Sequence, residues 1–360
     1  MKVVTVVGAR PQFIKAAPVS RALQAAGHAG FLVHTGQHYD YGMSQIFFDE
    51  LGIPQPDVNL GVGSGPHGAQ TAAMLGSIEQ VLLAEEPDWT LVYGDTNSTL
   101  AGALAAAKLH IPTAHIEAGL RSFNRRMPEE INRVLTDHIS DLLFCPSQTA
   151  VDNLAAEGIT NGVHLVGDVM ADALLWVAAR AGERSDALQR LGLTEKGFLL
   201  ATVHRAENTD DPARLRAILD AFAALDEPIV FPVHPRTRNR IQMLNLSSAV
   251  PHLQFVDPVG YLDMVCLEQG ARMILTDSGG IQKEAYWLGV PCVTLRDETE
   301  WIETVELGWN VLVGAETDKI VAAVRGWRVP EEWPALYGDG EAARRLVRTW
   351  EAKEWAWEYA

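Results

Sequence analysis

Three acidic side chains and one histidine stand where acid–base chemistry needs them, near apolar runs of the chain. Asp95, Glu117 and His204 closely follow such runs, and Glu129 opens a segment with helical spacing. Carboxylates and imidazole groups can take or return a proton at a reacting carbon when their surroundings tune their pKa values. Glu117 has mainly apolar neighbours, which favours a perturbed pKa. The sequence therefore offers these four residues as candidate acids and bases.

Each of these residues also has a structural alternative. Asp95 could cap the helix that follows it, and His204 could be a buried, hydrogen-bonded histidine of the core. Glu129 could pair with Arg133 four residues later, or simply favour the first turn of a helix, each worth about 0.5 kcal/mol. The sequence leaves these alternatives open.

The segment Ser278-Gly279-Gly280 has the composition of a phosphate-binding turn. It lies between an apolar run and a helical segment that is expected to begin at about Ile281. Backbone N–H groups at a helix N-terminus attract anions, and two glycines let a ligand approach the backbone closely. Glu284 follows one turn later, where a carboxylate can accept the hydroxyl groups of a ribose. The alternatives are a simple turn capped by Asp277 or Ser278, and a solvated Glu284.

Arg10 and Lys15 are the candidate cations for such an anionic ligand. Pro11 suits the first turn of a helix that follows the first apolar run and carries Lys15 one turn further on. A guanidinium held at a strand end can make two parallel hydrogen bonds to a diphosphate, although both residues could instead be solvated surface cations. The formal net charge of −17 repels anions, so an anionic substrate needs a local cation.

These residues must be positioned by strands that alternate with helices. Helical segments are expected at 16–26, 67–84, 171–181, 213–224 and 281–288. The candidate strands form two sets, namely 3–7, 31–35, 89–93, 112–116, 142–145 and 163–166, followed by 198–203, 229–233, 253–256, 273–276, 292–295 and 311–313. Such alternation predicts an α/β fold with two doubly wound, Rossmann-like domains, each built on a parallel sheet.

The length of 360 residues also fits two domains. We place the boundary after Asp168, which gives an N-terminal domain of residues 1–168 and a C-terminal domain of residues 169–340. Residues 341–359 are expected to form a further helix rich in tryptophan and arginine. Ligands bind beyond the carboxyl ends of the strands in open parallel sheets, so polar residues at these ends are expected to form two rims facing a central cleft.

The composition argues against several classes of protein. No apolar run reaches the ~20 residues that span a bilayer, and the first run is too short for a signal peptide, which predicts a cytoplasmic protein. The acidic balance disfavours nonspecific binding to nucleic acid or membranes. The three cysteines are expected to be buried and reduced, and the eleven histidines show no metal-binding spacing. Residues 61–65 match a dinucleotide fingerprint only loosely and are expected to be a loop.

Five motifs together resemble one family, the non-hydrolysing UDP-N-acetylglucosamine 2-epimerases, in the same order and over almost the whole chain. The motifs are Gly8-Ala9-Arg10-Pro11, His115-Ile116-Glu117-Ala118-Gly119-Leu120-Arg121-Ser122, Pro128-Glu129-Glu130-Ile131-Asn132-Arg133, Thr202-Val203-His204-Arg205-Ala206-Glu207-Asn208 and Asp277-Ser278-Gly279-Gly280-Ile281-Gln282-Lys283-Glu284-Ala285. The resemblance implies a fold similar to the GT-B glycosyltransferases, with a last helix, 341–360, that packs back on the first domain. It also implies a homodimer that takes a UDP-sugar as substrate, needs no cofactor or metal, and serves polysaccharide biosynthesis.

The resemblance further implies a reaction and a role for each site residue. In the family, UDP is removed across C1–C2 to give a bound 2-acetamidoglucal and is added back with C2 inverted, which interconverts UDP-GlcNAc and UDP-ManNAc. Residues implied to hold UDP are Arg10, Ser278, Gly279 and Gly280 at the diphosphate and Glu284 at the ribose. Residues implied to surround the sugar and the reaction are Lys15, Asp95, Glu117, Glu129, Arg133 and His204.

Three positions depart from the family pattern. Trp301 stands where members commonly have arginine, and Asp40 and Ala69 stand where members regulated by a second UDP-N-acetylglucosamine carry glutamine and arginine. The pattern is closer to a branch that includes epimerases of UDP-2,3-diacetamido-2,3-dideoxyglucuronate, which is the alternative substrate. A GT-B glycosyltransferase and a non-catalytic sugar-nucleotide sensor are the competing functions.

Overall fold

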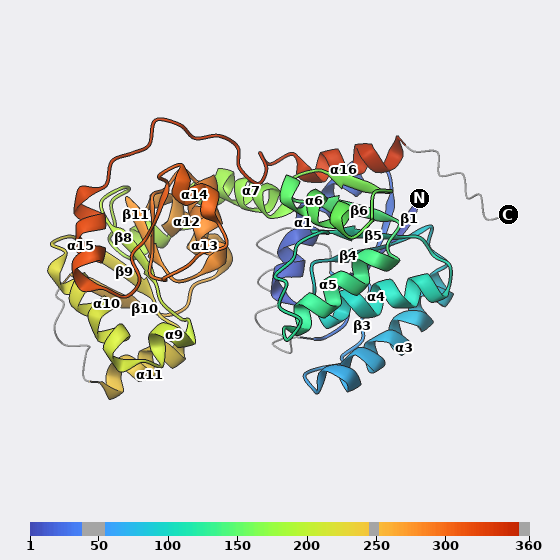
Figure 1. Ribbon diagram of the computed structural model, residues 1–360, viewed down its shortest axis with the longest axis horizontal. Helices are drawn as coiled ribbons and strands as arrows, with labels where there is room; N and C mark the ends of the chain where they lie inside the picture. The colour runs from blue at the N-terminus through green and yellow to red at the C-terminus, as the bar shows by residue number, and fades with distance from the viewer. Residues whose placement is uncertain (38–54, 245–251, 353–360) are drawn as a thin grey trace. The chain divides into compact units, whose positions relative to one another are not determined.

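The computed structural model describes residues 1–37, 55–244 and 252–352, and it contains two parallel sheets (Figure 1). The first sheet has the order β3-β2-β1-β4-β5-β6-β7 and the second the order β10-β9-β8-β11-β12-β13. The first is built from β1 (Lys2–Val7), β2 (Ala29–His34), β3 (Val58–Asn59), β4 (Trp89–Tyr93), β5 (Thr113–Ile116), β6 (Leu142–Cys145) and β7 (Val163–Leu165). The second is built from β8 (Leu199–Thr202), β9 (Ile229–Pro232), β10 (Leu253–Val256), β11 (Met273–Thr276), β12 (Cys292–Thr294) and β13 (Asn310–Leu312).

The central strands are continuous apolar runs because helices cover both faces of each sheet. Every residue of β4, β5, β6, β8 and β11 is buried. The α/β prediction with two doubly wound sheets is confirmed, and each of the twelve expected strands has a counterpart. The two-residue strand β3 was not predicted, because so short a segment carries no pattern of apolar residues.

Contacts divide the chain into two units, each with its own sheet. Unit 1 comprises Met1–Ala173 together with Tyr337–Ala360, and unit 2 comprises Leu174–Leu336. Helices of unit 1 are α1 (Arg10–Ala25), α3 (His67–Glu85), α4 (Asn97–Lys108), α5 (Pro128–Ile139), α6 (Gln148–Ala156) and α16 (Ala342–Glu351), while α7 (Val169–Arg184) runs across the division. Helices of unit 2 are α8 (Ala187–Arg190), α9 (Ala206–Thr209), α10 (Pro212–Ala224), α11 (Pro235–Met243), α12 (Tyr261–Gly270), α13 (Gly279–Trp287), α14 (Ile302–Glu306) and α15 (Thr317–Gly326). Within the described residues, none of these helices is long and apolar enough to cross a membrane.

Helix α1 begins at Arg10, so Pro11 lies in its first turn as expected, and the helix is continuous with the segment expected from residue 16 onward. The Gln12 side-chain oxygen accepts hydrogen bonds from the amides of Gly8 and Ala9, at 2.8 and 3.0 Å. Its amide nitrogen donates to the Tyr93 carbonyl at 2.8 Å. Gln12 therefore caps α1 and ties the β1–α1 turn to the carboxyl end of β4.

The last described helix, α16, packs on unit 1 through Trp350. This side chain is 1% exposed and lies edge-on to Trp89, with 5.2 Å between the ring centroids. The N-terminus of α16 is capped by Asp172, whose carboxylate accepts hydrogen bonds from the amides of Ala342 and Ala343 at 3.1 and 2.8 Å. Burial raises the pKa of Asp172 to about 6, Asp168 adds to the rise, and the two amides oppose it.

Replacing Asp172 with asparagine should remove a pH-dependent part of the stability. Between about pH 4 and pH 6 the folded protein keeps a proton on Asp172 that the unfolded chain has released, so this group's contribution to the unfolding free energy falls as pH rises. An asparagine oxygen still accepts the α16 amides but does not titrate. From pH 4 to pH 6, we expect the unfolding free energy of wild type to fall by up to about 3 kcal/mol relative to that of Asp172→Asn. Urea unfolding at each pH measures this difference. The exposed Asp152 provides the control, and an equal shift in Asp152→Asn would contradict the assignment.

Candidate active site

A pocket of about 220 Å³ lies in unit 1 at the carboxyl end of its sheet. Its walls come from the β1–α1 turn, the residues after β4 and the first turns of α3, α4 and α5. Three predicted site residues line it, namely Lys15, Asp95 and Glu129. Gln37 and His67 also line the pocket, although no pattern in the sequence singled out His67.

Lys15 and Glu117 form an ion pair beside this pocket. Lys15 is 8% exposed, and although burial lowers its pKa, the charge and hydrogen bond of Glu117 raise that pKa above its ordinary value. Gly94 packs against this pair, because a Cβ atom there would lie 3.0 Å from Glu117 Oε2 and 3.4 Å from Lys15 Nζ. Lys15 therefore stays a cation that faces a carboxylate.

The backbone of Glu117 adopts a left-handed conformation with φ of +69°. This region is unfavourable for a residue with a side chain, by about 1–2 kcal/mol, so the surrounding structure must hold it there. The residue follows β5 directly, and its amide donates to the Phe144 carbonyl of β6 at 3.1 Å. The left-handed turn carries the side chain out of the strand to Lys15.

Asp95 is held by helix α5. Its carboxylate pairs with Arg133, and its carbonyl accepts a hydrogen bond from the Asn132 side chain at 2.9 Å. Arg133 also pairs with Glu130 at 3.3 Å. Burial raises the pKa of Glu130, but hydrogen bonds from Ser122 and Phe123 and the charge of Arg133 hold that pKa below its ordinary value.

Two structural alternatives for this region are wrong. The N-cap of α4 is Thr96, whose hydroxyl accepts from the Thr99 amide at 3.3 Å, so Asp95 does not cap that helix. The ion pairs of Arg133 in the described part of the chain go to Asp95 and Glu130, and Glu129 instead lines the pocket from the first turn of α5.

In unit 2, Asp277 organises the loop after β8. Its buried carboxylate accepts hydrogen bonds from the amides of His204 and Arg205, at 3.1 and 3.0 Å, and from the Asn208 side chain at 3.1 Å. The His204 side chain is 50% exposed, with Nδ1 3.6 Å from Asp277, so the alternative of a buried core histidine is wrong. An exposed imidazole at the carboxyl end of β8 is free to meet a ligand.

The segment Ser278-Gly279-Gly280 forms the N-terminus of α13. The helix begins at Gly279, not at Ile281, and Ser278 is its cap, accepting from the Ile281 amide at 3.4 Å. A Cβ atom on Gly279 would make ordinary van der Waals contacts with side-chain atoms of Glu300, Arg205 and Trp301, at 3.6 to 3.8 Å. Three polar side chains therefore surround the Gly279 turn, and Gly280 itself is exposed.

Two further side chains fix the Gly279 turn, and the sequence did not assign either to it. The Trp301 indole donates to the Gly279 carbonyl at 2.7 Å, and the Lys283 ammonium lies over the Trp301 ring, 4.3 Å from its centroid. Arg296 pairs through both nitrogens with Glu300, each at 2.9 Å. The only sequence signal was the departure from the family pattern at Trp301.

Glu284 lies half-buried one turn into α13, beside Glu268 of α12. Glu268 is 1% exposed, and burial together with the charge and hydrogen bond of Glu284 raises its pKa well above the ordinary value. The side chain of Arg10, the first residue of α1, lies outside the described part of the structure, as do Asp40 and its surroundings. Ala69 is exposed on α3.

The predicted residues thus gather in two groups. Unit 1 brings Lys15, Asp95, Glu117, Glu129 and Arg133 to one sheet end, and unit 2 brings His204, Ser278, Gly279, Gly280 and Glu284 to another. The first group contains carboxylates beside cations, which suits proton transfer. The second contains exposed amides at a helix N-terminus, which suits an anion.

Comparison with known proteins identifies the family. A UDP-N-acetylglucosamine 2-epimerase from Methanocaldococcus jannaschii has a solved structure that is 44% identical, covers 98% of this chain and 100% of that chain, and matches with a TM-score of 0.89. A second structure of that enzyme, in complex with UDP-GlcNAc and UDP, is 45% identical over 98% and 100% of the two chains, with a TM-score of 0.82.

Relatives of known sequence agree with this match. A UDP-2,3-diacetamido-2,3-dideoxy-D-glucuronate 2-epimerase from Pseudomonas aeruginosa and a UDP-N-acetylglucosamine 2-epimerase homolog from Methanococcus maripaludis are each 54% identical, over 96% of this chain and 98% of theirs. A sequence model described as UDP-N-acetylglucosamine 2-epimerase matches residues 21–351. The chain therefore belongs to the UDP-N-acetylglucosamine 2-epimerase family.

Proposed function

We propose that this chain is a non-hydrolysing 2-epimerase that interconverts UDP-GlcNAc and UDP-ManNAc. The observation that carries the proposal is the group of Lys15, Asp95, Glu117, Glu129 and Arg133 around the pocket of unit 1. Epimerisation at C2 needs one group to take the C2 proton and another to return a proton on the opposite face. Carboxylates that follow β4 and β5 and one on α5 lie at this pocket. They can supply both the group that takes the C2 proton and the group that returns one.

The proposed reaction balances without a cofactor. The C1–O bond to UDP breaks and its electron pair leaves with UDP, while a carboxylate takes the C2 proton and the C1–C2 double bond forms. In the return step a UDP oxygen adds to C1 and a carboxylic acid protonates C2 on the other face. Charge that develops at C1 is stabilised by nearby carboxylates.

UDP itself is assigned to unit 2. The amides of Gly279 and Gly280 and the cap Ser278 would bind the diphosphate, and Glu284 would accept hydrogen bonds from the ribose hydroxyls. His204 would meet the departing diphosphate or the sugar. The position of the two glycines at the N-terminus of α13 and the exposure of Gly280 and His204 support these roles.

A second substrate is UDP-2,3-diacetamido-2,3-dideoxyglucuronate, and Trp301 favours it. This indole occupies the place of a common arginine and packs on the Gly279 carbonyl. The relative from Pseudomonas aeruginosa that acts on this sugar is 54% identical.

NMR of each UDP-sugar in D₂O with purified protein tests the reaction. The proposal expects the 2-epimer to appear with deuterium at C2, without added cofactor or acceptor, and the ratio of kcat/KM values decides between the two substrates. Release of free UDP only when an acceptor is supplied would instead show a glycosyltransferase. Saturable binding of both UDP-sugars with no deuterium incorporation would show a sensor.

Replacing Glu117 with glutamine should abolish turnover while UDP binding stays within about threefold. The amide keeps the size of the side chain but cannot transfer a proton at C2, and loss of general acid–base catalysis costs about 10²- to 10⁴-fold. The surface Glu85, which pairs with Lys2 at 2.9 Å, provides a matched control for losing a lysine–glutamate pair. Full activity of Glu117→Gln in the deuterium-exchange assay would remove Glu117 from the mechanism.

We further propose that the enzyme is a cytoplasmic homodimer and that α5 contributes to its interface. The described cysteines are all free and buried, which fits a reducing compartment. Ile131 and Leu135 are spaced by four residues along α5, Met127 is the residue just before the helix, and the three are 46, 47 and 38% exposed, so they form one apolar stripe from the start of α5. A self-associating face is the simplest reason for such a stripe.

Replacing Ile131 with aspartate should therefore give a monomer, because a charge at the centre of an apolar interface is left without a partner. Sedimentation velocity of both proteins at micromolar concentration measures the mass. Met243 on α11 is 74% exposed and provides the control, since Met243→Asp should leave the oligomer intact. A wild type that sediments as a monomer would refute the dimer.

A further inference from the structure

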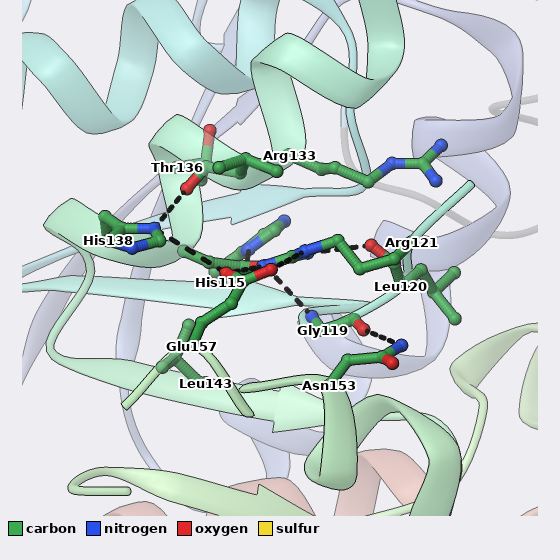
Figure 2. A network of polar contacts seen from close by, with 12 residues as sticks. His115, Gly119, Leu120, Arg121, Arg133, Thr136, His138, Leu143, Asn153 and Glu157 are labelled. Atoms are coloured by element: carbon green, nitrogen blue, oxygen red, sulfur yellow. Dashed lines mark hydrogen bonds and ion pairs between the residues drawn. The ribbon is translucent and has the colours of Figure 1, made fainter. Parts of the chain in front are cut away.

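A network of four charged side chains joins β5, α5 and α6, and Figure 2 shows three of them, His115, Arg121 and Glu157. The network consists of His115 on β5, Arg121 in the loop after β5, Asp137 on α5 and Glu157 at the end of α6. The side chains of His115 and Asp137 are 0% exposed, that of Arg121 is 1% exposed, and that of Glu157 is 28% exposed. Asp137 has no role in the proposed reaction, so its burial against two cations needs another explanation.

The hydrogen bonds of His115 define its proton content. Nδ1 lies 2.7 Å from Asp137 Oδ1, and Nε2 lies 2.7 Å from the Gly94 carbonyl oxygen. A carbonyl and a carboxylate engaged by other donors can only accept, so both ring nitrogens must donate. The ring is then an imidazolium.

Asp137 supplies the negative charge that this ring needs. Its second oxygen accepts hydrogen bonds from the Gly119 amide at 3.2 Å and from Arg121 at 2.6 Å. Burial raises the pKa of Asp137, but the hydrogen bonds and charges of His115 and Arg121 hold it below its ordinary value. Arg121 is neutralised in turn by both oxygens of Glu157, at 2.7 and 2.8 Å. Two cations and two anions thus balance.

The network makes hydrogen bonds to the backbone at two glycines near Glu117. The first is Gly94, which follows β4 and packs against the Lys15–Glu117 pair, and its carbonyl accepts a hydrogen bond from His115. Downstream, the Asp137 carboxylate accepts a hydrogen bond from the Gly119 amide, and the Asn153 side chain of α6 donates to the Gly119 carbonyl at 3.0 Å. Figure 2 shows Asn153 next to Gly119. Gly119 has φ of +79°, and a Cβ there would lie 2.3 Å from the Ala150 carbonyl oxygen, so this turn has no room to shift.

We propose that His115 and Asp137 are positioning residues, which hold Glu117 in its left-handed conformation as a buried imidazolium–carboxylate pair. They act through hydrogen bonds to the backbone of Gly94 and Gly119, and they do not touch the substrate. The predicted effect on turnover rests on the proposed epimerase function. The protonation of His115 and the backbone conformation of Glu117 do not depend on that function.

The variant Asp137→Asn tests the proposal, because it keeps the size of the side chain and removes its charge. Without the carboxylate, nothing on the Nδ1 side requires the ring to keep its second proton. One ring nitrogen then has no hydrogen to donate, and the hydrogen bond to Gly94 or to α5 is lost. We expect kcat to fall up to about 100-fold with KM little changed, and the dependence of kcat on pH between pH 6 and pH 8 to become steeper than in wild type.

Other groups near His115 do not account for such a pH dependence. Arg121 stays charged, and burial raises the pKa of the Cys145 thiol of β6 to about 12. Lys15 and Glu117 beside Gly94 remain an ion pair. Asp137 is therefore the group whose charge sets the proton on His115.

Asp141→Asn is the matched control. Asp141 accepts a hydrogen bond from the Thr113 amide at 2.8 Å, so it holds the opposite end of the same strand β5. If Asp137 contributed only to stability, both variants would be less stable and the dependence of kcat on pH would be unchanged in both. A pH profile of Asp137→Asn that matches the profile of Asp141→Asn overturns the positioning role.

Two measurements do not depend on turnover. In protein labelled with ¹⁵N-histidine, long-range ¹H–¹⁵N spectra at pH 7.5 should show both ring nitrogens of His115 protonated, with the signal assigned by its loss in His115→Gln. A crystal structure of Asp137→Asn should show Glu117 leaving the left-handed region. One bare ring nitrogen in wild type, or an unchanged Glu117 backbone in the variant, overturns the proposal even if the protein catalyses a different reaction.

Discussion

The candidate site depends on the register of parallel strands. Tyr93 of β4 pairs with Ile116 of β5, and neighbouring strands lie about 4.8 Å apart, so Asp95 and Glu117 leave the sheet side by side. The same rule applies in unit 2, where Thr202 pairs with Thr276. The loop of His204 and the turn of Ser278 therefore leave together, and Asp277 joins them by hydrogen bonds. Shifting either register by one residue would displace one loop along its strand by about 3.3 Å and separate these side chains.

Charge is handled locally in a protein with a net charge of −17. The cations around the unit 1 pocket are held by acids of the same unit, Lys15 by Glu117 and Arg133 by Asp95 and Glu130. Such pairs orient the carboxylates before a substrate arrives, which lowers the cost of reaching the reacting geometry. In unit 2 we propose that the attraction for an anion comes from backbone amides at the start of α13, which carry no counter-charge to displace.

The sequence predicts the parts of this structure that depend on local pattern. Apolar runs located twelve strands, and polar residues after them located Asp95, Glu117 and His204. It could not predict which acid Arg133 meets, because Glu130 and Asp95 compete through a fold that joins residues far apart in the chain. Pro11 marked the first turn of α1, but the cap by Gln12 could not be predicted, since it acts through side-chain hydrogen bonds that leave no periodic signal. The partners of Asp137 were invisible for the same reason.

Helix α5 shows how one segment can serve two demands. Its inward residues Asn132, Arg133 and Asp137 hold the loops that carry Asp95 and Glu117, while Ile131 and Leu135 face outward. Positions that are one and two residues apart on a helix point in different directions, so the two sets do not compete for space. A rigid helix nevertheless moves as one body. Any partner that packs on the outer stripe of α5 would therefore also restrict the motion of Asp95, Gly94 and Gly119, and through them the geometry of Glu117.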